Sequence, residues 1–141
     1  MRRLIIGSVL LWSILLVAAC GIGSGEWEDD PKNWRRAFGY SKPAEIVMPH
    51  SWYWRSPHWT REEAYFFQFQ WHEELFKQLL AKNGMRPFEG SESPGYCFGK
   101  PGWFAPPSAA GYKSWRCDSS TDCWLFREAK TKELFLYVCQ L

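Results

Sequence analysis

Histidine is scarce in this chain of 141 residues, which contains only His50, His58 and His72. A structural zinc site takes four ligands, and a catalytic site takes three protein ligands plus water. His50 and His58 each follow a proline, but no carboxylate stands at ligand spacing between them. His72 opens a stretch resembling the helical zinc protease motif, yet Phe76 occupies the position of the required second histidine. We therefore expect no metal site and no cofactor.

A recognisable catalytic set is also missing. His50 and Ser51 are adjacent, so in a strand they would point to opposite faces and could not act as base and nucleophile. The acidic pairs at 62–63 and 73–74 are sequence neighbours, which does not place two carboxylates across a substrate. No phosphate-binding glycine loop is present. We expect that the protein is not an enzyme, and keep an enzyme of unknown class as the third alternative.

Long hydrophobic runs are limited to one, Leu4 to Val17, which glycine and serine interrupt. It is shorter than the roughly 20 apolar residues that a membrane-spanning helix needs. Arg2 and Arg3 precede the run and two alanines follow it, which is the layout of a secretory signal peptide. Cys20 comes directly after these small residues. The segment from Arg2 to Cys20 resembles the lipobox signal of bacterial lipoproteins.

This resemblance implies that residues 1–19 are removed and that Cys20 becomes the lipidated first residue. The protein would then lie in the bacterial cell envelope, held to a membrane by acyl chains such as palmitate. Gly21 rather than aspartate after the cysteine implies the outer membrane rather than the inner one. The glycine-rich residues 20–26 are expected to form the lipidated cysteine and a flexible tether. By length, residues 27–141 are expected to form a single globular domain.

Neither positive nor negative charge is in excess in the part expected to remain after removal of residues 1–19. The full chain has 17 Lys and Arg residues against 15 Asp and Glu residues, and removal of Arg2 and Arg3 leaves 15 of each. A neutral domain has no general electrostatic attraction for nucleic acid or anionic lipid. We expect the membrane, through Cys20, and a protein as partners, with a glycan as an alternative and no nucleic acid.

The five cysteines are an odd number for an exported protein. Lipidation of Cys20 leaves four, which in an oxidising compartment are expected to form two disulfides. These are Cys97, Cys117, Cys123 and Cys139. Four cysteines allow three pairings. We favour Cys123–Cys139, because the last hairpin is expected to oppose them, which leaves Cys97–Cys117; the alternative is four buried thiols.

The remaining chain alternates strand and helix patterns. Strands are expected at 44–48, 51–55, 64–71, 123–127 and 134–139, helices at 30–39 and 72–82, and irregular structure over the Pro- and Gly-rich residues 87–121. We expect 51–55 to pair with 64–71, and Arg127 to face Phe135 in the last hairpin. The predicted fold class is α+β: a small antiparallel sheet of about four strands packed by one main helix, with two disulfides.

Tryptophan is abundant, with ten in the chain and nine after residue 19. Most are expected in the core, since indole rings bury a large area. Trp103 and Phe104 lie in a loop stiffened by prolines and glycines, so we predict that they are exposed anchors for a partner. Trp54 and Arg55, within the aromatic segment 49–59, form a second candidate patch.

These observations predict a lipid-anchored interaction protein of the periplasm or cell surface, without catalysis. Its most specific form is an immunity-type lipoprotein that binds a toxin acting in the periplasm. The alternative is a carbohydrate- or cell-wall-binding module in which tryptophan rings stack on sugars. Neither the identity of the partner nor the oligomeric state follows from the sequence.

Overall fold

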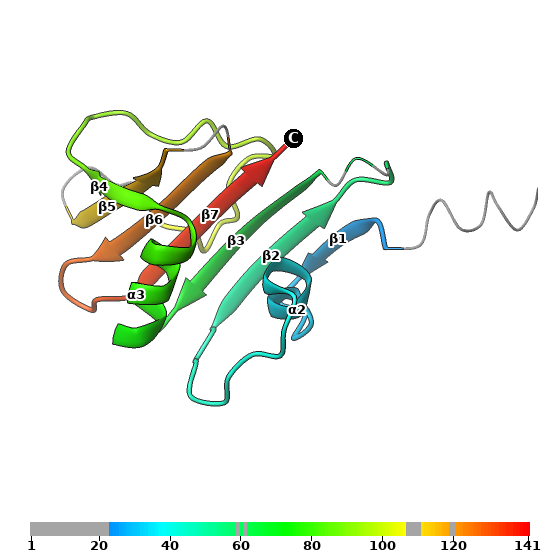
Figure 1. Ribbon diagram of the computed structural model, residues 1–141, viewed down its shortest axis with the longest axis horizontal. Helices are drawn as coiled ribbons and strands as arrows, with labels where there is room; N and C mark the ends of the chain where they lie inside the picture. Colours follow the sequence, from blue (N-terminus) through cyan, green and yellow to red (C-terminus); the bar gives the residue numbers. More distant parts are fainter. Residues whose placement is uncertain (1–22, 59, 61, 107–110, 119–120) are drawn as a thin grey trace, which may run out of the picture.

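The computed structural model describes residues 23–58, 60, 62–106, 111–118 and 121–141, and these form one seven-stranded antiparallel sheet. In chain order the strands are β1 (Gly25–Glu28), β2 (His50–Arg55), β3 (Glu63–Phe69), β4 (Met85–Phe88), β5 (Tyr112–Cys117), β6 (Asp122–Glu128) and β7 (Leu134–Gln140). Two helices, α2 (Asn33–Phe38) and α3 (Glu73–Lys82), complete the fold. Across the sheet the strand order is β1-β2-β3-β7-β6-β5-β4 (Figure 1).

The signal peptide, Cys20 and the inferred outer-membrane position fall on residues outside those described. Within the described part of the chain, neither helix has the length and apolar character needed to cross a membrane. The predicted tether, residues 20–26, overlaps β1, since Gly25 already pairs with Arg55.

The predicted sheet of about four strands, packed by one main helix and closed by two disulfides, is wrong. Three strands were missed: β1, which overlaps the end of the predicted tether, and β4 and β5, which lie at the start of or within the segment expected to be irregular. Conversely, residues 44–48 do not form a strand. The pairing of β2 with β3 is confirmed, with Tyr53 opposite Tyr65. Both helices are confirmed, and α2 ends at Gly39, whose φ of 82° suits glycine.

One face of the sheet, called the helix face, is covered by α2 and α3 (Figure 1). Trp34 of α2 is buried with its ring centroid 6.0 Å from that of Phe69. The buried Asn33 side chain donates hydrogen bonds to the Trp27 carbonyl at 2.9 Å and the Ser51 hydroxyl at 3.1 Å. These bonds satisfy a buried amide and fix α2 against β1 and β2.

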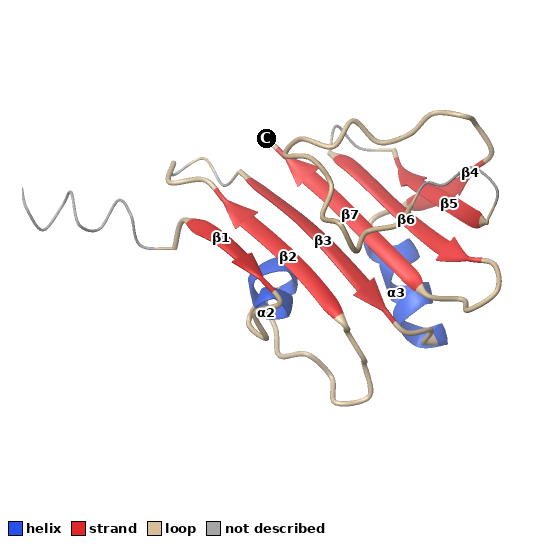
Figure 2. Ribbon diagram, turned by 180° about the vertical axis from the view of Figure 1, so that it is seen from behind, coloured by secondary structure: helices blue, strands red, loops and turns tan. Residues whose placement is uncertain are grey.

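The opposite face, called the loop face, is covered by the segment between β4 and β5 instead of a helix (Figure 2). Its core contains Phe66, Phe104, Trp124 and Tyr137. Cys97 of this segment forms a disulfide with Cys139 of β7. The Cys97 amide also donates to the Tyr137 hydroxyl at 3.1 Å. The segment predicted as irregular thus forms one wall of the core.

The predicted disulfides Cys123–Cys139 and Cys97–Cys117 are both wrong, because the last hairpin pairs one residue out of the expected register. Cys123 lies opposite Val138, and Arg127 lies opposite Leu134. A slip of one residue sends a side chain to the other face of a sheet. Cys139 therefore belongs to the loop-face core, where it reaches Cys97, while Cys117 and Cys123 are buried thiols of the helix-face core.

Candidate functional site

The prediction that Phe104 is an exposed anchor is wrong. Its side chain is 0% exposed, and its ring meets those of Phe66 and Phe135 edge-on, at centroid distances of 4.9 and 5.6 Å. The described part of the segment between β4 and β5 passes over this face of the sheet (Figure 2), and its Phe104 ring packs among the loop-face aromatic residues. Phe104 is therefore a core residue.

Trp103, its neighbour, is partly buried beside the first residue of β2. Its ring stacks on that of His50, with centroids 5.3 Å apart and planes at 18°. The indole Nε1 is buried and has no hydrogen-bond partner among the described residues. Trp103 therefore packs this part of the loop onto the sheet.

Trp54 and Arg55, the second candidate patch, lie on opposite faces of the sheet. Trp54 and Arg55 are neighbours in β2, so they point to opposite faces, and Trp54 belongs to the loop face. The Trp54 ring lies against Phe98, with centroids 4.2 Å apart, and Phe98 is 45% exposed. The structure thus brings Trp54 together with Phe98 and not with Arg55. The sequence analysis did not predict Phe98 as a binding residue. Its position next to Cys97 was the signal that could have indicated it.

A groove runs beside this aromatic pair, between β1 and residues 98–101; we call it the β1 groove. It encloses about 310 Å³ and is lined by Glu26, Glu28, Trp52, Phe98, Gly99, Lys100 and Pro101. Glu26 accepts a hydrogen bond from the Trp52 indole at 2.7 Å. The Lys100 ammonium donates to the Ala105 and Pro106 carbonyls, both at 3.3 Å, so it is held by the loop backbone. The groove combines two exposed carboxylates with aromatic rings.

The three histidines lie apart and have separate structural roles. His50 Nδ1 lies 3.1 Å from Asp29 Oδ2, and His50 is 42% exposed at its side chain. His72 begins α3, where its Nδ1 accepts a hydrogen bond from the Leu75 amide at 3.2 Å. His58 is an exposed turn residue. Among the residues that the structure describes, no cluster of three or more His, Cys, Asp or Glu side chains could hold a metal ion.

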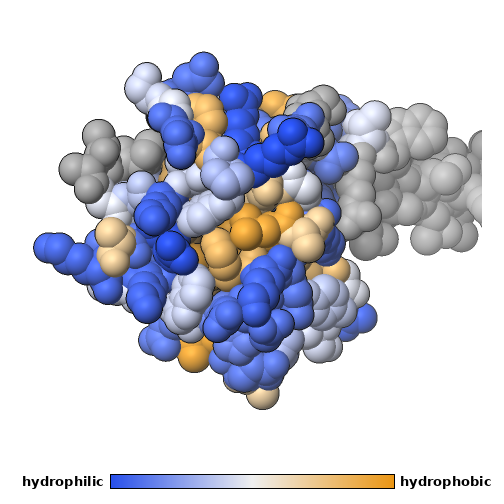
Figure 3. All heavy atoms as spheres, turned by 60° about the vertical axis from the view of Figure 1, so that its left-hand side comes forward, coloured by the Kyte–Doolittle hydropathy of each residue, from blue (hydrophilic) through white to orange (hydrophobic). Residues whose placement is uncertain are grey.

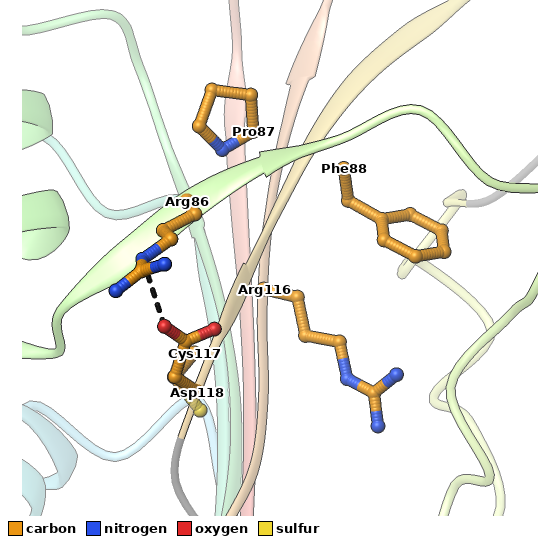
Figure 4. A pocket seen from close by; sticks show the side chains of 6 residues that line it. All are labelled: Arg86, Pro87, Phe88, Arg116, Cys117 and Asp118. Atoms are coloured by element: carbon orange, nitrogen blue, oxygen red, sulfur yellow. Dashed lines mark ion pairs between the residues drawn. The ribbon is translucent and has the colours of Figure 1, made fainter.

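A second hollow, of about 380 Å³, lies at the opposite edge of the sheet (Figure 4). Arg86 of β4 and Arg116 of β5 are directly opposite each other there. Arg86 Nε lies 2.8 Å from Asp118, and Arg116 lies 3.2 Å from Glu92. Each guanidinium already has a carboxylate partner, so this edge has a compensated charge pattern rather than an anion site.

An apolar hollow of about 300 Å³ lies between the helices, lined by Phe38, Tyr40, Leu75, Gln78, Leu79, Ala81 and Lys82. The Lys82 ammonium lies 5.3 Å from the centroid of the Phe38 ring. From the β4–β5 side, the molecule shows an apolar area framed by hydrophilic side chains (Figure 3). Gln78 and Lys82 are the polar side chains among the named lining residues, and the Lys82 ammonium already lies over the Phe38 ring.

Comparisons with protein-family models, with curated proteins and with solved structures find no match to this chain. The β1 groove offers carboxylate acceptors, exposed aromatic surface and a neighbouring sheet edge, which are binding features rather than a catalytic set.

Proposed function

We propose that this chain is a lipid-anchored protein of the bacterial cell envelope, in the outer membrane, that binds another protein without catalysis. The observation that carries the proposal is the Trp54–Phe98 pair at the rim of the β1 groove. Aromatic residues are enriched at protein interfaces, where a few buried rings supply most of the binding energy. Phe98, with 45% of its surface exposed, would bury this area only against a partner.

The short distance between the anchor and the sheet supports a binding surface close to the membrane. Gly25, the first residue of β1, follows Cys20 by five residues. A fully extended chain of that length spans at most about 18 Å. A lipid on Cys20 would therefore keep the β1 edge near the bilayer, where a membrane-associated partner is accessible.

The most specific form of the proposal is an immunity-type lipoprotein that covers a toxin acting in the periplasm. A glycan is the second candidate ligand. Trp54, which is only partly buried beside exposed Phe98, and Glu26 support it, since an indole face can stack on a sugar ring and a carboxylate accepts hydrogen bonds from hydroxyl groups.

Site-specific photo-crosslinking in intact cells tests the proposal. A photoreactive phenylalanine analogue is placed at Phe98, and at Tyr40, which is 46% exposed on the other side of the sheet, as the control. We expect one protein adduct from position 98 and none from position 40, with the adduct lost in Trp54→Ala. No adduct, or the same adducts from both positions, would overturn the proposal; retention of the mature domain on cell-wall glycans, lost in Trp54→Ala, would favour the second candidate.

A further inference from the structure

We propose that the β1 groove binds a basic, extended segment of the partner, which pairs with the outer edge of β1 and places Lys or Arg side chains against Glu26 and Glu28. The inference rests on the proposed function and specifies the chemistry of the partner. It is carried by three features: an open sheet edge, two carboxylates on one face of that edge, and aromatic rings beside them.

The two edges of the sheet differ in their capacity to accept another strand. At one edge, β4 contains Pro87, which has no backbone N–H to donate, and the exposed Arg86. At the other, β1 contains no proline, and only β2 pairs with it (Figure 1). The outward backbone groups of β1 have no strand partner in the described part of the chain. Such an edge is a template for an added strand.

The charge on β1 determines which strand fits. Glu26 and Glu28 are two residues apart, so both point to the loop face and into the groove. A second copy pairing antiparallel about Trp27 would place glutamate opposite glutamate, which is unfavourable, whereas a basic strand would place opposite charges together. Neither carboxylate has an ion-pair partner among the described residues, while nearby Asp29 already contacts His50.

The aromatic rings provide surface for the side chain of an incoming lysine or arginine. Trp52 and Phe98 line the groove together with the two glutamates. Phe98 is the exposed one of these two rings, and a long basic side chain can pack its methylene groups on it while its charged end reaches a carboxylate. The helix face of β1 is already occupied by such a contact, since the Arg36 guanidinium lies 4.1 Å from the centroid of the Trp27 ring. The groove side is thus the available side of this strand.

The experiment uses residues 21–141, which contain every strand, both helices and the disulfide, and so retain the complete core. A capped heptapeptide of alternating threonine and lysine is titrated while tryptophan fluorescence and amide hydrogen exchange are followed. We expect saturable binding, slower exchange at the β1 amides and weaker binding as salt concentration rises. Glu28→Gln should weaken binding about threefold. Glu45→Gln, at an exposed position away from the groove, is the matched control and should leave binding unchanged.

Two further peptides make the outcome decisive. Replacing lysine by glutamate, or methylating alternate backbone nitrogens, should abolish binding. Equal binding of either peptide, or unchanged affinity in Glu28→Gln, would overturn the inference. A crosslinked partner at position 98 together with no binding of the basic peptide would refute this inference while leaving the proposed function intact.

Discussion

Phe104 shows how strongly a residue's environment depends on chain segments distant from it. In the sequence it lies among prolines and glycines, a setting typical of an exposed loop. In the structure its ring completes an aromatic cluster contributed by β3, β6 and β7, with Phe66, Phe126 and Phe135 as neighbours. Phe98 lies in the same loop, and 45% of its surface is exposed. Of two phenylalanines six residues apart, one therefore packs in the core and the other lies at the surface.

Truncation distinguishes these two roles. Phe104→Ala should lower the free energy of unfolding by about 3–5 kcal/mol, because it removes a fully buried ring and leaves a cavity. Phe98→Ala, the matched control, should cost about 1 kcal/mol or less, since much of the ring is already in water. Urea unfolding of both variants measures the difference. Equal losses would contradict the assignment of Phe104 to the core.

Cys117 and Cys123 should be chemically protected in the folded protein. Burial raises the pKa of the Cys123 thiol, and nearby Cys117 raises it further, so the reactive thiolate is disfavoured. Cys117 Sγ donates a hydrogen bond to the Thr121 carbonyl at 3.1 Å. We expect residues 21–141 to react with maleimide at neither thiol when folded and at both after unfolding without reductant. Mass spectrometry measures this, and labelling of the folded protein would refute the prediction.

At the scale of elements, the long segment between β4 and β5 takes the place of a covering helix. Among its described residues, two backbone hydrogen bonds lie within the segment, from the Gly99 amide to Tyr96 and from the Phe104 amide to Pro101. Its position therefore depends largely on side chains and on the Cys97–Cys139 disulfide. The Tyr137 hydroxyl supports the same point of the loop, since it accepts from the Cys97 amide and donates to the Gly95 carbonyl. The loop wall of the β1 groove follows Cys97 directly, so the groove depends on this attachment.

Removing the disulfide tests that dependence. The cysteines are 42 residues apart, and the chain-entropy treatment gives about 4 kcal/mol for closing a loop of that size. The double variant Cys97→Ser, Cys139→Ser should lose stability of that order in denaturant unfolding. Reductant should destabilise the wild type by a similar amount and leave the double variant unchanged. A reductant effect that persists in the variant would mean that other cysteines carry the bond.

At the scale of the whole molecule, the sheet begins almost at the expected anchor. The residues between Cys20 and β1 are Gly21 to Ser24, two fewer than the predicted tether, which reached residue 26. A lipidated protein would therefore hold its β1 edge toward the membrane and its β4 edge away from it. The two edges also differ in charge, with glutamates on β1 and paired arginines on β4 and β5.

Replacing Cys20 tests the anchoring. Cys20→Ser should leave the precursor unprocessed and without incorporated palmitate, because the resemblance to lipoprotein signals implies that this cysteine is the acylated residue. Cys123→Ser is the control and should retain the label. Wild-type protein should fractionate with the outer membrane, since several acyl chains at about 0.8 kcal/mol per buried methylene hold it firmly. Palmitate on Cys20→Ser, or an inner-membrane location, would contradict the corresponding part of the prediction.

Local patterns were sufficient for the elements that carry strong periodicity. The alternating aromatics of β3, the antiparallel partner β2, and the apolar stripe and terminal signals of α3 all follow from neighbouring residues along the chain. The short strands β1, β4 and β5 lack that signal: β1 is four residues long with a leading glycine, and β4 contains a proline. The partners of β1 and β4 lie more than 20 residues further along the chain, in β2 and β5, so their extended form depends on contacts that no local pattern shows. β5 pairs with β4 on one side and, across a short connection, with β6 on the other.

The sequence by itself determined the strongly periodic elements, which are β2, β3, β6, β7 and both helices, and that an aromatic-rich chain of this length must bury many rings. Only the tertiary structure decided which cysteines meet and which rings remain at the surface. The physical reason is that successive side chains of a strand point to opposite faces of the sheet, but the strand sequence does not determine which face another chain segment will cover. A one-residue register between β6 and β7 sent Cys139 toward Cys97, and the path of one loop buried Phe104 and left Phe98 beside the acidic edge of β1.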